Sequence, residues 1–154
     1  MSVTRKSTPA KRKFERMSVK AGVLAGSTYP TDDHKNAKTG KRVFDTRAEM
    51  PTAVIAAALE YGTHQRVARP FMHLTVAEQQ KAWVCALRTL LKSGVSVPGA
   101  FAAVGQIMQE DIQHTISTWP GDNSSAWSAV KGFNHGLILT SHLLKSIAFE
   151  TSDS

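Results

Sequence analysis

The stretch LEYGTHQRVARPFMHLT, residues 59–75, divides this chain into its structural parts. Residues 61–63 end an alanine-rich segment with a glycine, which tolerates positive φ. Residues 68–72 contain a proline, and the residue before a proline is pushed out of the α region. Thr75 is followed three residues later by Glu78, the pattern of a capping box that starts a helix. The stretch therefore predicts a short turn-and-strand joint between two helices.

A helix is predicted on the N-terminal side of this joint, over residues 52–61, because alanine is the best helix former. Pro51 fits the first turn of such a helix, and Gly62 stands where a left-handed cap is wanted. The apolar run over residues 53–61 leaves a buried strand open as the competing interpretation.

Two longer helices are predicted on the C-terminal side, over residues 75–92 and 96–117, because apolar residues recur there at three- and four-residue spacing. The apolar set of the first is Val76, Trp83, Val84, Leu87, Leu90 and Leu91. That of the second is Phe101, Val104, Ile107, Met108, Ile112, Thr115 and Ile116. Asp111 lies beside the second stripe, where a buried carboxylate would need a partner such as Arg69.

Strands are predicted near both ends of the chain. From Met17 apolar and polar residues alternate, the period-two pattern of a half-buried strand. A final strand, in which Ile147 and Phe149 share a face, follows a turn over residues 140–144. Thr39-Gly40 fits a hairpin tip, followed by a possible short strand over residues 41–46.

The order of these elements predicts an α+β fold, with a small antiparallel sheet packed against two or three helices and a flexible basic N-terminal arm. We accordingly divide the chain into an arm over residues 1–16, a single domain over residues 17–150 and a short tail over residues 151–154.

The net charge of +7 is concentrated in the arm. Residues 1–20 hold seven basic side chains and one acidic side chain, whereas the rest of the chain is nearly neutral. Such an arm either is a solvated terminus or contacts a polyanion such as DNA without reading its sequence. The candidates for polyanion contact are Arg5, Lys6, Lys11, Arg12, Lys13 and Arg16.

Motifs for catalysis, metals or cofactors are not evident. The single cysteine excludes an internal disulfide and a thiolate zinc site. The six histidines are scattered, and the run Asp32-Asp33-His34 has no second ligand group at a recognisable spacing. No apolar run approaches the length of a membrane span, and the first residues lack the apolar stretch of a secretory signal. We therefore expect a protein without enzymatic activity or cofactor, used in a cytosol or in an assembly built there.

An ordered series of short motifs resembles a known family. The series is GVLAGSTYP, AAALEYGT, ARPFM, VGQIMQEDIQHTI, WPGDNS and KGFNHGLILTSHLLKSI. In this order the motifs resemble the tail-completion or neck proteins of long-tailed bacteriophages, the group that includes the minor tail protein Z type of lambda-like phages. The resemblance runs from about Val19 to Phe149. Ser141 and Leu144 depart from it, since the family usually has glycine and a polar residue there.

The resemblance implies a structural virion protein at the head-tail junction, assembled in the host cytoplasm, that completes the tail so that head and tail can join. It also implies a homo-oligomeric ring, of about six subunits, that contacts tail terminator, tail tube or head-connector proteins. A ring needs heterologous contacts between subunits. The candidate contact residues are Tyr61, Arg69, Phe71, Met72, His142 and Leu144.

Several alternatives stay open. Arg69 fits an internal salt bridge as well as a contact between subunits, and Phe71 fits either the core or a partner-facing position. A tail terminator, a head-closure connector or a small DNA-binding packaging protein acting through the arm are the alternative functions.

Overall fold

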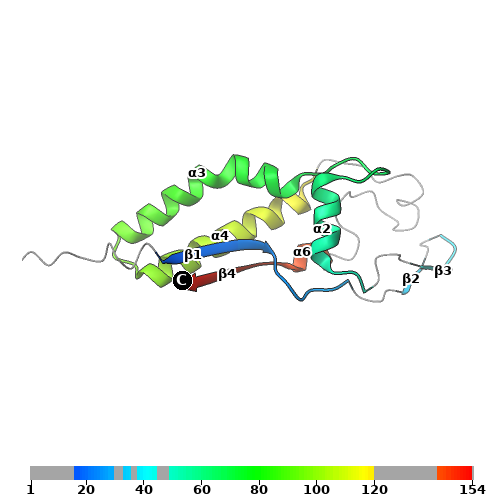
Figure 1. The fold of residues 1–154 in the computed structure, drawn as a ribbon, viewed down its shortest axis with the longest axis horizontal. Coiled ribbons are helices and arrows are strands. Elements are labelled where there is room, and N and C mark those ends of the chain that lie inside the picture. Colours follow the sequence, from blue (N-terminus) through cyan, green and yellow to red (C-terminus); the bar gives the residue numbers. More distant parts are fainter. Residues whose placement is uncertain (1–15, 30–32, 36–37, 45–48, 120–141, 154) are drawn as a thin grey trace, which may run out of the picture.

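The computed structural model describes residues 16–29, 33–35, 38–44, 49–119 and 142–153. Two long helices run beside a two-stranded sheet, and a shorter helix stands across one end of the sheet (Figure 1). The predicted α+β class is confirmed. Of the predicted basic arm, only Arg16 lies within the described residues, where it is exposed.

The main sheet joins segments from the two ends of the chain. β1 (Met17–Val23) pairs antiparallel with β4 (Ile147–Asp153), from Met17 opposite Asp153 to Val23 opposite Ile147. Both predicted strands are confirmed, but β4 continues through Asp153. Residues 151–153 therefore belong to the sheet, and the expectation of a tail that starts at residue 151 is wrong for them.

A second, separate hairpin follows β1. β2 (Asp33–Lys35) pairs antiparallel with β3 (Arg42–Phe44), and Thr39-Gly40 lies between the two strands as predicted. Gly40 has a φ of 66°, the left-handed conformation that a tight turn requires.

α2 (Thr52–Tyr61) confirms the predicted alanine-rich helix, so the alternative of a buried strand is wrong. Pro51 occupies its N-cap, and Gly62 ends it with a φ of 76°. A side chain at Gly62 would meet the backbone nitrogen of Ala68 at 2.8 Å and the backbone oxygen of Arg66 at 2.9 Å. Glycine is therefore required here both for the backbone angle and for the close approach of the loop.

α3 (Phe71–Lys92) begins four residues earlier than predicted. The carboxylate of Glu60, at the end of α2, accepts hydrogen bonds from the backbone N–H groups of Met72 and His73, both at 2.9 Å. A side chain from another helix thus satisfies first-turn donors that a capping box would otherwise satisfy. The predicted strand through Phe71 and the predicted capping box at Thr75 are both wrong, because these residues lie inside the helix.

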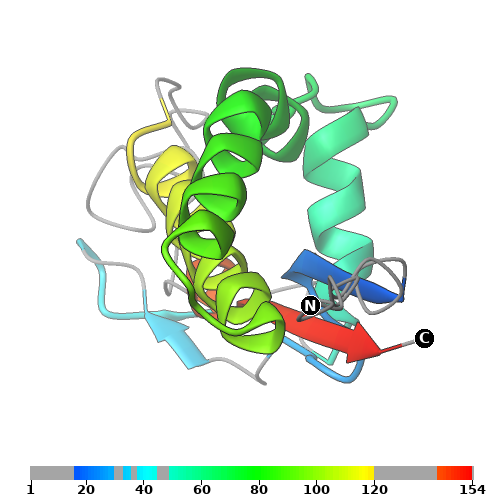
Figure 2. The ribbon, with the colours of Figure 1, turned by 90° about the vertical axis from the view of Figure 1, so that its left-hand side faces the viewer.

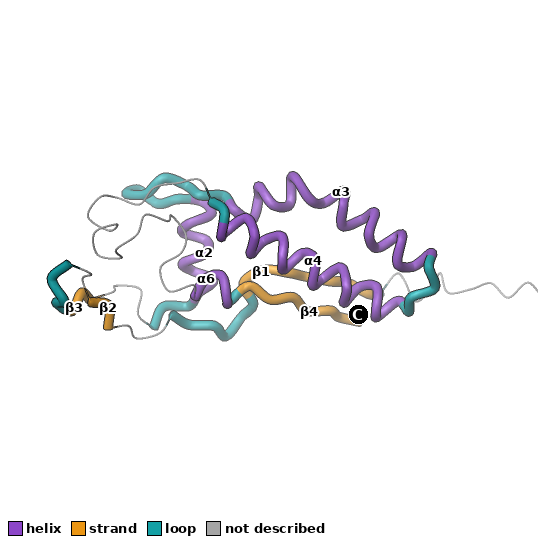
Figure 3. Tube along the Cα trace, turned by 180° about the vertical axis from the view of Figure 1, so that it is seen from behind, coloured by secondary structure: helices purple, strands orange, loops and turns teal. Residues whose placement is uncertain are grey.

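α4 (Val97–Ser117) has the predicted bounds, and the Ser96 side chain accepts a hydrogen bond from the backbone N–H of Gly99 at 3.2 Å. It packs against α3 on one side and against both strands of the sheet on another. Seen from behind, α4 lies over the sheet (Figure 3). Gly105 allows this approach, since the side chains of Phe149 and Val19 occupy the space that a β-carbon would need.

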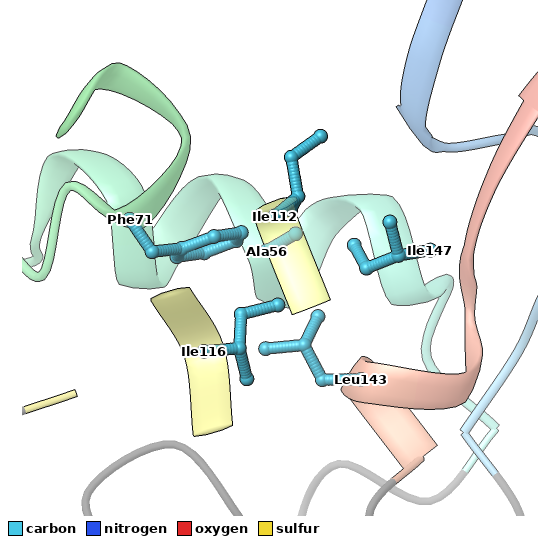
Figure 4. Close-up of a cluster of buried hydrophobic side chains, with 6 residues drawn as sticks. All are labelled: Ala56, Phe71, Ile112, Ile116, Leu143 and Ile147. Atoms are coloured by element: carbon cyan, nitrogen blue, oxygen red, sulfur yellow. The ribbon is translucent and has the colours of Figure 1, made fainter. Parts of the chain in front are cut away.

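The core lies where α2, α3, α4 and the start of β4 meet (Figure 4). The short helix α6 (His142–Lys145), which includes part of the predicted turn, contributes one residue to it. The buried cluster consists of Ala56, Phe71, Ile112, Ile116, Leu143 and Ile147. Burial of these side chains fixes the ends of the long helices against the sheet.

Candidate assembly surface

The described residues contain no group of three or more His, Cys, Asp or Glu side chains placed to hold a metal ion. Asp33 and His34 lie on β2, whereas Asp32 lies outside the described residues. Of the helices that the structure describes, none is long and apolar enough to cross a bilayer.

A cluster of hydroxyl groups surrounds His142. Thr52 is fully buried, and its hydroxyl lies 2.8 Å from Ser27 Oγ and 3.3 Å from His142 Nε2. Ser27 also donates to Ser146 Oγ at 3.2 Å, and the ring of Tyr29 packs edge-on against His142 with centroids 4.7 Å apart. These contacts tie α2, α6 and the segment after β1 together. His142, a predicted contact residue, is half-buried in this cluster.

Phe71 and Leu144 differ in burial but both contact the core. Phe71 is 0% exposed, so of its two interpretations the core is correct and a partner-facing position is wrong. Leu144 is half-buried against the core, and its backbone oxygen accepts a hydrogen bond from Gln113 Nε2 at 3.1 Å.

Three other predicted contact residues lie near the joint between α2 and α3. Tyr61 is 83% exposed at the end of α2. Arg69 is half-buried, and its backbone N–H donates to the Leu59 oxygen at 2.6 Å. Met72 is half-buried, with its terminal methyl group close to Gly22. Of the predicted contact residues, Tyr61 therefore offers the most accessible side chain.

Asp111 has a partner that the sequence did not indicate. Trp83, which is 7% exposed, donates its indole N–H to Asp111 Oδ2 at 2.6 Å. One turn further along α4, Thr115 Oγ1 lies 2.7 Å from the hydroxyl of Thr75, which donates to the Phe71 oxygen at 2.7 Å. The carboxylate thus accepts a hydrogen bond from a tryptophan across the α3–α4 contact.

An apolar groove of about 380 Å³ separates α2 from the start of α3. Figure 2 shows the two helices on either side of this region, with β1 below. Small alanine side chains form much of one wall. The residues that define the α2–α3 groove include Val23, Ala53, Ala57, Glu60, Met72 and Val76.

A largely open apolar surface lies on the second half of α3. Its residues form what we call the α3 ridge: Val84, Leu87, Arg88, Leu91 and Lys92. The sequence pattern assigned Val76 and Val84 to the buried stripe of this helix, yet they are 43% and 59% exposed. That part of the prediction is wrong, because the core uses the stripe of Phe71, Thr75 and Trp83.

Comparison with known proteins gives no match: no family model, no curated protein and no solved structure matches this chain.

Proposed function

We propose that this protein is a structural subunit of the bacteriophage neck, which completes the end of the tail and allows head and tail to join as part of a ring. The observation that carries the proposal is the ordered series of motifs from about Val19 to Phe149, which resembles the tail-completion proteins.

The positions of the central motif residues are compatible with this proposal. Glu60 caps α3, Gly62 ends α2 and Phe71 fills the core, so the motif EYGT followed by RPF holds two helices at a fixed angle. Apolar side chains that remain exposed on a small domain suit a protein that buries them in an assembly. Tyr61, at 83% exposed, and Val84, at 59%, are of this kind.

The proposal is tested with phage that carry a stop codon in this gene. Electron microscopy of the lysate should show DNA-filled heads and full-length tails that remain separate. Adding the purified protein to the lysate should then restore joined, infectious particles. Normal joined particles in the absence of the protein would refute the proposal.

The same lysate separates tail completion from head closure. Heads and tails are purified, each is incubated alone with the protein and then repurified, and the two are mixed. Tail completion predicts that only the treated tails become competent for joining. Competence of the treated heads would assign the protein to head closure instead.

The basic arm supports one alternative, a DNA-binding packaging protein. Seven basic side chains within residues 1–20 would neutralise phosphates and make DNA binding steeply dependent on salt. A variant lacking residues 1–16 should still restore joining if the neck proposal is right. Loss of packaged DNA, together with loss of salt-dependent DNA retention, would favour the alternative.

A further inference from the structure

The α2–α3 groove and the α3 ridge lie on one face of the molecule. Val76 lines the groove. Counted from Val76 as position i, the ridge residues Val84, Leu87 and Leu91 stand at i+8, i+11 and i+15. This spacing keeps side chains on the same side of an α-helix. α3 has 22 residues, so the face extends over roughly 33 Å. At the end of this face that contains the start of α3, α2 lies beside α3 (Figure 2).

The two halves of this face differ in the size of their side chains. The groove is lined on the α2 side by the small residues Ala53 and Ala57, whereas the ridge contains the larger residues Leu87 and Leu91, which are half-buried. Groove and ridge occupy opposite ends of α3. An antiparallel α3 from a second molecule would therefore place its ridge in the groove, and receive the first ridge in its own.

The two halves also differ in charge. The ridge carries Arg88 and Lys92, both exposed. The groove contains the carboxylate of Glu60, which also caps the first turn of α3, and the C-terminal end of α2, whose last turn has no basic residue. The C-terminal end of a helix carries partial negative charge and favours cations. Antiparallel pairing brings Arg88 and Lys92 to this end, whereas parallel pairing would place like charges together.

We propose that the face formed by the α2–α3 groove and the α3 ridge binds a second copy of this chain, with the two α3 helices antiparallel. Because both halves of the contact lie on one face, the interface is isologous and closes at two subunits. His73 then lies opposite the partner's Leu91, and Val76 opposite the partner's Arg88. Val84 lies close to the two-fold axis.

This dimer goes beyond the proposed neck function and does not depend on it. A closed dimer leaves the other surfaces of each subunit available for the contacts of a ring. The tests below use purified full-length protein, whereas the neck proposal is tested on phage particles, so either can fail while the other stands.

The first test measures mass in solution by analytical ultracentrifugation over a concentration series. The parent protein should form a dimer. Val84→Lys should raise the dimer dissociation constant by roughly a hundredfold, because it buries a lysine charge close to the same lysine of the partner molecule near the two-fold axis. Since Val84 is 59% exposed in the subunit, its thermal unfolding should change little. Ile107→Lys, on an exposed apolar residue of α4, is the matched control and should leave the dimer intact.

The second test fixes the orientation by disulfide cross-linking in a Cys85→Ser background. Val76→Cys and Arg88→Cys are made singly and together. The two sites lie about 18 Å apart along one helix, so they cannot link within a chain. The double variant should give covalent dimers, and neither single variant should.

Each outcome decides the proposal. Cross-links in a single variant would mean parallel pairing and overturn it. A ladder of larger covalent products from the double variant would mean a head-to-tail contact, and would also overturn it. A protein that stays monomeric throughout the concentration series, or a Val84→Lys variant that dimerises like the parent, would show that this face does not bind a second copy.

Discussion

Replacing Phe71 with alanine should lower the free energy of unfolding by about 3–5 kcal/mol, the usual cost of removing a large aromatic side chain from a core. The side chain is 0% exposed and lies in the cluster with Ile112 and Ile116 (Figure 4). It is also the first residue of α3, so the cavity would open where α3 meets α4 and α2. Domains of this size have a free energy of unfolding of only about 5–15 kcal/mol, so the loss is a large share of the total stability.

The loss is measured by urea unfolding, followed by far-ultraviolet circular dichroism. The midpoint should fall while the m-value stays unchanged, since the folded state remains compact. In thermal unfolding the midpoint should drop by roughly 6–20 °C, taking about 2–4 °C for each kcal/mol.

Tyr61→Ala is the control, because this aromatic side chain is 83% exposed and lies only ten residues away. Its unfolding free energy should stay within about 0.5 kcal/mol of the parent. The argument would be refuted if Phe71→Ala unfolded within about 1 kcal/mol of the parent, or if the two variants lost equal stability.

Three further predictions concern contacts of the helices with each other and with the sheet. Glu60→Ala should cost about 1–2 kcal/mol in urea unfolding, because it removes the acceptor for two N–H groups of the first turn of α3; an unchanged midpoint would contradict the capping role. Gly105→Ala should destabilise by about 1–3 kcal/mol despite the better helix propensity of alanine, because Phe149 occupies the space of the new methyl group. A gain in stability would show that the sheet moves aside at little cost. Trp83→Phe should cost about 1–3 kcal/mol through the lost hydrogen bond to Asp111, and a double-mutant cycle with Asp111→Ala should give a non-zero coupling energy.

The elements predicted correctly are those whose pattern is local. Alternation from Met17 identified β1, and the apolar spacing between Ser96 and Ser117 identified α4, because in each case the periodicity of a single face is visible in the sequence. The need for a glycine at the end of α2 was equally clear, since Gly62 has a positive φ.

The features that were missed depend on contacts between distant residues. The start of α3 is set by Glu60, whose carboxylate accepts a hydrogen bond from the N–H group of Met72, twelve residues later in the chain. The local capping-box pattern at Thr75 was therefore misleading. Thr75 is instead buried at the contact with Thr115. A threonine inside a helix that bonds to a neighbouring helix has the same local sequence pattern as a threonine that caps a helix. The pattern alone therefore cannot distinguish the two.

The candidate surface was only partly predictable for a related reason. α3 has apolar residues on more than half of its circumference, and the sequence cannot say which part faces the core. Trp83 faces the core, whereas Val84, the next residue, belongs to the exposed ridge. The groove was missed because it needs the angle between α2 and α3, which the joint sets through Gly62 and Glu60.

The pairing of β1 with β4 has a consequence for biosynthesis. Ser18 and Ser152, whose hydroxyl groups lie 2.6 Å apart, are 134 positions apart in the chain. A nascent chain therefore carries β1 without its ladder partner while α2, α3 and α4 are being made. Closure of so long a loop is slow compared with helix formation, so sheet formation should be the late step of folding. The two strands of the sheet thus come together only after α2, α3, α4 and α6, which lie between them in the chain, have been translated.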